Sequence, residues 1–177
     1  MTNRFNIPII LGTAREGRLS EKVARFVLNE IKKIKSISSE IIDIKNYLSS
    51  ATIAPKETGE LVKQVQEIIN NANGLIIVMP EYNHAFPGEL KIFIDKIGKQ
   101  AKGKPLGLCG VSSGAIGGAR AVENFINIAV YLGFQIVIPA IYFPFVENLF
   151  NEKNEINNEK ITGNLKKMLD DLIDKAK

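Results

Sequence analysis

Residues 5–34 read FNIPIILGTAREGRLSEKVARFVLNEIKKI, and this stretch contains the repeating unit of the fold. The segment from Phe5 to Leu11 is apolar, has the length of a strand and is bounded by Gly12, which indicates a strand buried on both faces. From Ser20 to Ile34, apolar side chains recur at helical spacing and predict a helix. We therefore expect a strand, a polar loop and a helix in direct succession, as in an α/β fold.

The same alternation continues along the rest of the chain. Further strands are expected at residues 39–44, 75–79, 105–111 and 134–141, and further helices at about residues 61–73, 87–98, 122–133 and 157–177. Pro139 suggests an edge or a bulge in the last strand. The Asn-rich segment 147–158 is interpreted as a surface linker only. Five strands and five helices predict a doubly wound, five-stranded parallel sheet in the order 2-1-3-4-5, covered by helices on both faces. One domain is expected over residues 1–177.

Composition argues against several classes of protein. The chain has 177 residues, of which 45% are hydrophobic and 24% charged, as expected of a globular domain. It has no run of 18 apolar residues, which argues against a membrane span, and its polar start lacks a signal-peptide pattern, so we expect a cytoplasmic protein. The net charge of +4 is spread along the chain and favours the binding of phosphates over nucleic acid.

The chain has one cysteine, Cys109, and one histidine, His84. A lone cysteine inside an apolar run is interpreted as an inert core residue of a protein in a reducing compartment. One residue of each type also argues against ordinary zinc sites and histidine-based nucleophilic sites built within one chain. We therefore predict no metal site and no catalytic side chain, and we expect a cofactor to carry the chemistry.

Three polar loops follow the first, third and fourth strands, whose carboxyl ends meet at one edge of such a sheet. The first loop, residues 12–20, combines two glycines, the hydroxyl groups of Thr13 and Ser20 and the guanidinium groups of Arg15 and Arg18. Backbone N–H groups, charged donors and the start of a helix together predict a phosphate site. The alternative is a Ser N-cap that follows a solvated loop.

This loop is neither a Walker A sequence nor the G-x-G-x-x-G sequence of a dinucleotide-binding fold. Asp43 near the end of the second strand is followed by Ile44 and Lys45, which is not the setting of a ribose-binding carboxylate. A Rossmann dehydrogenase is therefore disfavoured.

The second loop, residues 80–91, reads PEYNHAFPGELK. Its extended part exposes backbone groups that can meet the polar edge of a flat ring, and Tyr82 can flank the face of that ring. An ordinary loop before a helix start is equally compatible with this segment. The third loop, residues 112–120, reads SSGAIGGAR, and its glycines would let a flat ligand lie close to the backbone, although a Gly-rich turn alone is weak evidence.

Together the three loops resemble the NADPH-dependent FMN reductase family, a flavodoxin-like group that includes quinone, azo-dye and chromate reductases. The matching motifs are Gly12-Thr13-x-Arg15-x-Gly17-Arg18, Pro80-Glu81-Tyr82-Asn83 with Pro87-Gly88-x-Leu90-Lys91 and Asp95, and Ser112-x-Gly114-x-x-Gly117-Gly118. The resemblance covers residues 5–140. It implies a flavodoxin-like fold, FMN as cofactor and NADPH or NADH as electron donor.

The resemblance also implies which residues bind FMN: those of the first loop the phosphate, and those of the other two loops the isoalloxazine ring. The candidate cofactor-binding residues are Gly12, Thr13, Arg15, Arg18, Ser20, Pro80, Glu81, Tyr82, Asn83, Ser112, Ser113, Gly114, Gly117 and Gly118. For the Glu81 carboxylate we favour a structural role that ties its loop down. The chain departs from the family at Ile92, where Asn is common, and at residues 47–55, which replace a Pro-rich stretch near the possible substrate side.

The implied activity is electron transfer from NADPH or NADH, through FMN, to a quinone, an azo compound or a similar small acceptor. With one short chain to shape the site, the nicotinamide and the acceptor are expected to use the same flavin face in turn, in a ping-pong mechanism. The alternative is a flavodoxin-type electron carrier that docks on partner proteins, although Arg15, Arg18 and the positive net charge argue against it. A non-redox nucleotide-binding module gains no support from the second and third loops.

A homodimer or homotetramer is also expected. The helix at residues 87–98 begins beside the second loop, and Phe86, Ile92 and Phe93 would give it more apolar surface than one sheet face covers. In the family that the chain resembles, such surfaces pair subunits and complete the site.

Overall fold

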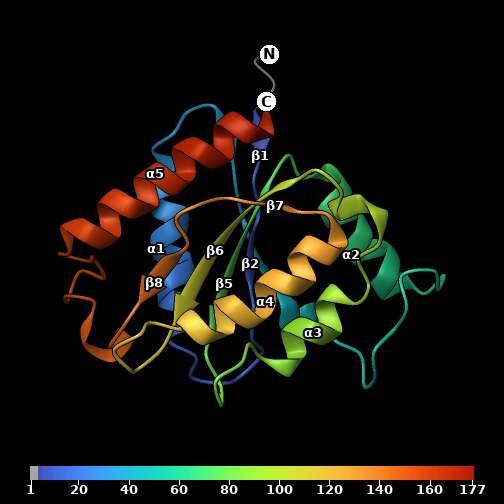
Figure 1. The fold of residues 1–177 in the computed structure, drawn as a ribbon, viewed down its shortest axis with the longest axis horizontal. Helices are drawn as coiled ribbons and strands as arrows, with labels where there is room; N and C mark the ends of the chain where they lie inside the picture. Colours follow the sequence, from blue (N-terminus) through green and yellow to red (C-terminus); the bar gives the residue numbers. More distant parts are fainter. Residues whose placement is uncertain (1–3) are drawn as a thin grey trace.

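The structure, a computed structural model, describes residues 4–177 as strands that alternate with helices (Figure 1). The strands are β1 (Phe5–Asn6), β2 (Ile9–Leu11), β3 (Ile37–Ser38), β4 (Ile41–Asp43), β5 (Leu75–Pro80), β6 (Pro105–Val111), β7 (Gln135–Ile136) and β8 (Ile141–Phe143). The α-helices are α1 (Ser20–Lys32), α2 (Glu60–Asn71), α3 (Gly88–Ile94), α4 (Ala119–Leu132) and α5 (Glu159–Ala176). The short 3-10 helices are η1 (Ile44–Tyr47), η2 (Lys99–Ala101) and η3 (Val146–Asn148).

The strands form a parallel sheet in the order β4-β2-β5-β6-β7, which is the predicted order 2-1-3-4-5. The first predicted strand is divided into β1 and β2, and the second corresponds to β4. An additional short strand, β3, lies ahead of β4 and pairs with β1. The register continues across the break, with Phe5 opposite Ile37 and Ile9 opposite Ile41. Pro8 lies in the break, where it has no N–H group to donate to the ladder.

The fifth predicted strand, residues 134–141, also differs from a single continuous strand. It is divided into β7 and β8, which both pair with β6. Ile136 lies opposite Leu106 and Ile141 opposite Cys109, so this side of the pair has two more residues than β6. Pro139, which lacks an N–H group, lies in that bulge, as the sequence suggested. Pairing then continues beyond the predicted end to Phe143.

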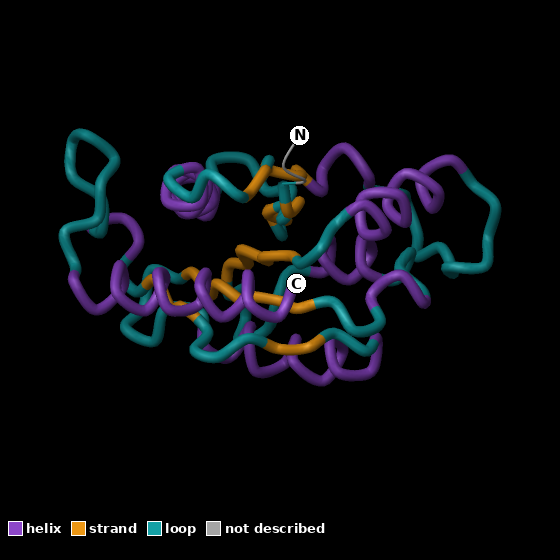
Figure 2. The backbone as a smooth tube through the Cα atoms, turned by 90° about the horizontal axis from the view of Figure 1, so that it is seen from above, coloured by secondary structure: helices purple, strands orange, loops and turns teal. Residues whose placement is uncertain are grey.

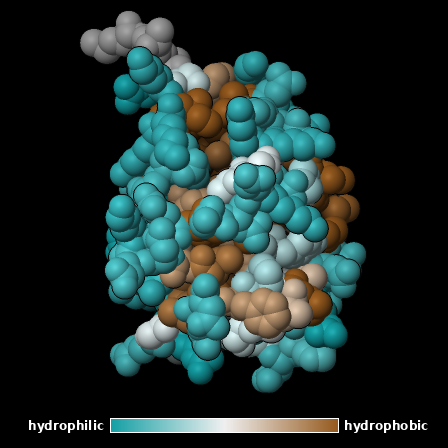
Figure 3. Space-filling model, turned by 90° about the vertical axis from the view of Figure 1, so that its left-hand side faces the viewer, coloured by the Kyte–Doolittle hydropathy of each residue, from teal (hydrophilic) through white to brown (hydrophobic). Residues whose placement is uncertain are grey.

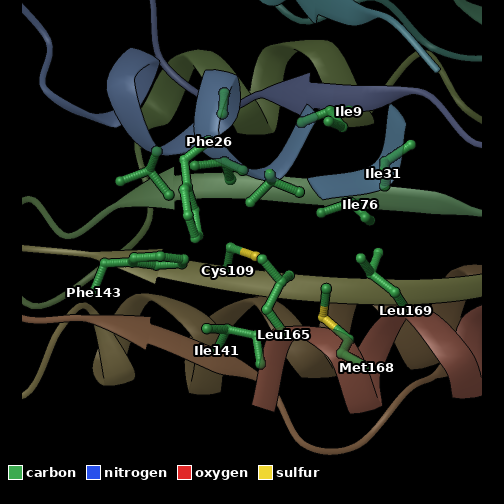
Figure 4. Packing of buried hydrophobic residues seen from close by; sticks show 14 of the residues in the cluster. Ile9, Phe26, Ile31, Ile76, Cys109, Ile141, Phe143, Leu165, Met168 and Leu169 are labelled. Atoms are coloured by element: carbon green, nitrogen blue, oxygen red, sulfur yellow. The ribbon is translucent and has the colours of Figure 1, made fainter. Parts of the chain in front are cut away.

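Helices cover both faces of the sheet (Figure 2). Alternate side chains of the strands point to opposite faces, so β2, β5 and β6 each contribute to two apolar clusters. One cluster packs under α1 and α5, and the other under α2, α3 and α4. Figure 4 shows the first of these, in which Cys109 lies between Phe26 and Leu165 in the core. Burial raises the pKa of the Cys109 thiol, so this side chain is an uncharged core residue, as predicted.

Viewed from the left of Figure 1, the surface is largely hydrophilic, with hydrophobic atoms visible between the polar side chains (Figure 3). Scattered apolar atoms of this kind are ordinary on a protein surface. Within residues 4–177, no helix combines the length and the apolar composition needed to cross a membrane.

Candidate functional site

A cleft of about 310 Å³ opens where β2, β5, β6 and β8 end, at the lower edge of the sheet in Figure 1. It is lined by Arg15, Glu16, Gly17, Arg18, Leu19, Ser20, Pro80, Glu81, Tyr82, Val111, Ser112, Ser113, Val146 and Glu147. Parallel strands end at one edge of the sheet, which is why three loops far apart in the sequence converge there.

Eight of the fourteen candidate residues from the sequence line this cleft. They are Arg15, Arg18, Ser20, Pro80, Glu81, Tyr82, Ser112 and Ser113. The six that do not line it are Gly12, Thr13, Asn83, Gly114, Gly117 and Gly118. The structure thus brings all three loops together, and it separates residues that face the cleft from residues that shape the loops behind it.

The first loop meets the cleft at the N-terminus of α1. Among the described residues, no side chain caps this helix, and the Ser20 hydroxyl is buried without a hydrogen-bond partner. The first backbone N–H groups of a helix have no partner inside the helix, and they carry a partial positive charge. Arg15 is exposed beside them. The positive end of the α1 dipole, a buried hydroxyl group and an exposed guanidinium group fit a phosphate at this corner.

Arg18 has a different environment from the one that the sequence suggested. Its Nη1 donates to the Thr13 carbonyl oxygen at 2.6 Å and to Asp43 Oδ1 at 3.0 Å, and its Nη2 donates to Asp43 Oδ2. The Arg18 side chain is only 7% exposed. Protein oxygens already occupy most of the Arg18 donors, which leaves fewer of them for a phosphate than the sequence suggested. Asp43 is the last residue of β4, the strand next to β2, and this position is the signal that could have identified the pair.

Tyr82 connects the first and second loops. Its hydroxyl group lies 3.3 Å from Oγ1 of the buried Thr13, and that same oxygen accepts a hydrogen bond from the Arg15 backbone N–H at 3.2 Å. The Arg15 guanidinium lies over the Tyr82 ring, 5.2 Å from the ring centre. This cation–π contact and the hydroxyl contact hold the ring at the cleft between the two loops.

The second loop continues as a tight hairpin. Tyr82 and Ala85 exchange both backbone hydrogen bonds, at 2.9 and 3.0 Å, around Asn83 and His84. Both central residues have positive φ, 49° and 64°, as a two-residue turn of this twist requires. Asn83 is therefore an exposed turn residue and does not line the cleft. Asn124 of α4 donates to the His84 carbonyl oxygen at 2.8 Å and so supports the hairpin.

The Glu81 carboxylate joins the second loop to the third. Its Oε2 accepts the backbone N–H of Arg120 at 3.2 Å, in the first turn of α4, and its Oε1 lies 3.5 Å from Arg120 Nη1. A carboxylate at a helix N-terminus satisfies an orphan donor and interacts favourably with the helix dipole. These contacts tie the second loop to α4, which is the structural role that the sequence analysis favoured for Glu81. Glu81 also lines the cleft.

The glycines of the third loop serve its own packing. Gly117 and Gly118 have φ values of 61° and 85°. A Cβ at Gly117 would lie 2.9 Å from the Phe143 backbone nitrogen, and one at Gly118 would overlap the backbone of Val111. These residues therefore let the loop fold back on β6 and β8, and close approach of a flat ligand to this loop stays a prediction.

A fourth segment, which the sequence analysis missed, completes the cleft. Val146 and Glu147 follow β8 and line it, so interpreting segment 147–158 as only a surface linker was wrong at its first residue. The Val146 backbone N–H donates to the Ser112 carbonyl oxygen at 3.1 Å, and that of Phe145 to the Gly114 carbonyl oxygen at 3.3 Å. The sequence analysis missed this segment because it ended the last strand at residue 141, whereas β8 runs two residues further, to Phe143.

Residues 47–55 and α3 do not line this cleft in a single chain. Tyr47 packs edge-on against Phe93, with ring centres 6.0 Å apart, and Pro55 lines a separate recess of about 430 Å³ between α3 and α4. The expectation that this stretch borders the substrate side is therefore not met within one chain.

The apolar surface expected on α3 is also arranged differently. Phe93 is fully buried in the core, and Phe86 packs edge-on against Phe125, with ring centres 5.4 Å apart. Phe93 is therefore not available to a partner, whereas Phe86 is only partly buried. The exposed apolar side chains of this region lie on α4 instead, where Val130 is 60% and Tyr131 89% exposed.

Comparison with known proteins agrees with the loop motifs. The sequence profile described as NADPH-dependent FMN reductase matches residues 5–148. A quinone reductase of Escherichia coli strain K12 is 31% identical over 150 residues, which cover 77% of this chain and 76% of the relative. A quinone reductase of Pseudomonas putida is 29% identical over 166 residues, which cover 90% of this chain and 88% of the relative.

The fold has a close match among solved structures. FerB, a flavoenzyme NAD(P)H:(acceptor) oxidoreductase from Paracoccus denitrificans, superposes with a TM-score of 0.81 over 97% of both chains at 22% identity. At this identity the likeness concerns the flavodoxin-like α/β fold. The profile match covers most of the chain, and the converging loops carry the motifs of the same group. The chain belongs to the NADPH-dependent FMN reductase family.

Proposed function

We propose that the cleft binds FMN and that the protein uses it to reduce a small acceptor at the expense of NADPH or NADH. The observation that carries this proposal is the buried, unpartnered Ser20 hydroxyl group at the uncapped start of α1. Ser20, Arg15 and the first N–H groups of α1 would hold the phosphate. Pro80, Tyr82, Ser112 and the neighbouring backbone would hold the ring. When bound, FMN accepts two electrons from a nicotinamide and returns them to an acceptor.

Quinones are the acceptor class that we propose first, because the relatives above are quinone reductases. Azo compounds are a second flat class of acceptor. The three loops line one cleft of about 310 Å³ in a single chain, which supports the proposal that nicotinamide and acceptor occupy it in turn. The protein's part is then to bind and orient the flavin and to admit both substrates to one side. The single thiol, Cys109, is consistent with work in the reducing cytoplasm.

The test is to release the flavin from the purified protein and to follow NADPH oxidation with and without a benzoquinone. We expect FMN as the released flavin and quinone-dependent oxidation of NADPH over many turnovers. FAD as the main flavin would contradict the cofactor assignment. The alternative function, a flavodoxin-type electron carrier, predicts bound FMN with no steady-state oxidation of NADPH, so the two functions are separated by the same pair of measurements.

We also propose that two copies pair through α3 and α4, as a dimer or as half of a tetramer. Tyr131 and Val130 are exposed beside the apolar recess between these helices, and such surface is usually covered by a partner. Light scattering on Tyr131→Glu should show a smaller particle than the wild type. Tyr142→Glu, at an exposed aromatic residue outside α3 and α4, is the matched control and should leave the mass unchanged. A monomeric wild type at micromolar concentration would contradict the proposal.

A further inference from the structure

We infer that Asp43 is a positioning residue for the phosphate-binding loop, which acts by holding Arg18 as a brace behind that loop. Arg18 is then not itself a main ligand of the phosphate. The inference rests on the proposed binding of FMN, and it assigns a role to a carboxylate that lies outside the sequence motifs of the three loops.

The brace connects three separate segments. Arg18 Nη1 reaches back to the Thr13 carbonyl oxygen, which closes residues 13–18 into a ring. The same guanidinium group meets both oxygens of Asp43 in a two-pronged contact. Asp43 is the last residue of β4, next to β2 in the sheet, so it anchors that ring to the sheet. A planar guanidinium group and a carboxylate fix each other's orientation in this arrangement.

Burial distinguishes the two arginines of the loop. The Arg18 side chain is 7% exposed and that of Asp43 17%, whereas Arg15 is exposed at the cleft. Of the Arg18 donors, both Nη1 hydrogens and one on Nη2 meet protein oxygens, and Nε faces Glu21 Oε2 at 3.6 Å. A guanidinium group has five N–H donors in all, so little of it is left for a ligand. Arg15, the Ser20 hydroxyl and the helix N-terminus remain for the phosphate.

The sign of the electrostatic effect separates a brace from a ligand. If Arg18 bound the phosphate, Asp43 would compete for it and would also repel the phosphate, so removing the Asp43 charge would strengthen FMN binding. If the pair is a brace, removing that charge releases Arg18, loosens the ring at Thr13 and weakens FMN binding. The two roles thus predict opposite changes for one substitution.

Asp43→Asn is the variant of choice. Asp43 Oδ1 also accepts the Lys45 backbone N–H at 3.2 Å, and this contact caps η1. Asparagine keeps Oδ1 for that contact, but it removes the charge and replaces Oδ2, which accepts from Arg18 Nη2, with an amide nitrogen that only donates. Glu21→Gln is the matched control, because it removes a neighbouring negative charge that faces Arg18 from the other side without contributing to the brace.

The experiment titrates apoprotein with FMN and with riboflavin, which lacks the phosphate, and follows flavin fluorescence. For Asp43→Asn we expect the Kd for FMN to rise about tenfold, with the Kd for riboflavin changed less than about twofold. Arg18→Ala should show the same pattern, and Arg18→Ala/Asp43→Asn should be no weaker than the worse single variant, because both remove one unit. Glu21→Gln should bind riboflavin as the wild type does and should bind FMN no more weakly than the wild type.

Tighter FMN binding by Asp43→Asn would overturn the inference and identify Arg18 as a phosphate ligand. Equal losses for FMN and riboflavin would overturn it as well, because they would show a general structural defect. Additive increases of the Kd for FMN in the double variant would also overturn the inference, because they would show that Arg18 and Asp43 act separately. Failure of the wild type to bind FMN would contradict the proposed function itself. Far-UV circular dichroism of each apoprotein confirms that folded chains are compared.

Discussion

The Glu81 carboxylate accepts a hydrogen bond from the backbone N–H of Arg120, so the loop after β5 is fastened to the first turn of α4. Glu81 N–H in turn donates to the Val111 carbonyl oxygen at 2.9 Å. The second and third loops thus form one wall of the cleft, and their spacing is set by this residue.

Replacing Glu81 tests that spacing. Glu81→Ala should lower the free energy of unfolding by about 2 kcal/mol, because a backbone donor at a helix start is left unpaired. Glu81→Gln keeps an acceptor oxygen and should lose less. Urea denaturation measures both. Arg120→Ala is the control: it removes a half-exposed side chain but keeps the backbone N–H, and it should cost less than about 1 kcal/mol. Equal losses in Arg120→Ala and Glu81→Ala would mean that the ion pair, not the backbone contact, matters.

Ser20→Ala should separate binding from stability. The Ser20 hydroxyl has no partner among the described residues, so its removal should leave the melting temperature of the apoprotein unchanged or slightly higher. FMN affinity should fall by about 2 kcal/mol, the contribution of a hydrogen bond to a charged group. Fluorescence titration and thermal melts measure the two quantities.

The opposite pattern is expected of Ser39→Ala. Ser39 Oγ donates to the Ile7 carbonyl oxygen at 2.6 Å, between β3 and β4, so this control should lower stability without changing FMN affinity. A Ser20→Ala variant that melts lower and binds FMN normally would place the hydroxyl group in the fold, not in the phosphate site.

Gly118→Ala should be among the most damaging single-methyl changes in the chain. It combines a φ of 85° with overlap between the new Cβ and the Val111 backbone, so we expect a loss of about 3 kcal/mol or more. Gly114→Ala in the same loop is the control. Its nearest neighbour would be Ser112 Oγ at 3.9 Å, and its φ is not positive, so the loss should stay within about 1 kcal/mol. Chemical denaturation measures the free energy of unfolding of both variants. Similar losses in the two would show that the loop does not pack tightly against Val111.

Asp43 should make stability depend on pH in the acid range. Burial tends to raise the pKa of this carboxyl, but hydrogen bonds from Arg18 and from the Lys45 backbone, with the Arg18 charge, outweigh it and leave the pKa below its ordinary value. The contribution of Asp43 is therefore complete at pH values above the pKa of the unfolded chain, and it is lost as the pH falls through the lower, folded pKa. Glu21 and Lys45 are the other charged groups near the pair.

Melting temperatures of the wild type and of Asp43→Asn between pH 7 and pH 3 test this dependence. The difference between the two proteins should be largest near neutral pH and should shrink toward acid, because protonation of Asp43 removes its contribution while the other carboxylates titrate in both proteins. A constant difference across this range would show that the charge of Asp43 does not stabilise the fold.

Steady-state kinetics should show that NADPH and a quinone use the cleft in turn. Double-reciprocal plots at several quinone concentrations should then be parallel, and a high quinone concentration should compete with NADPH. Intersecting lines would indicate a complex that holds both substrates. The recess between α3 and α4 that includes Pro55 would then be the first place to seek a second site.

The sequence by itself determined the alternation of strands and helices, the strand order and the three loops at one edge. These features depend on local patterns, such as the apolar run at 75–80, the helical spacing after Ser20 and the turn residues at 80–88. Local patterns also identified Tyr82 and Ser112 as residues of the cleft, because strand ends can be located from neighbouring residues alone.

Only the tertiary structure decided which loop residues face the cleft. Arg15 and Arg18 are equivalent in the sequence, but Arg18 lies within reach of Asp43, 25 residues away, and its guanidinium group is used there. Gly118 meets the backbone of Val111, and Val146 reaches the cleft because β8 extends past the bulge at Pro139. Such contacts depend on the distance and register between strands, which arise when the whole sheet is assembled and the competing partners of each polar group are fixed.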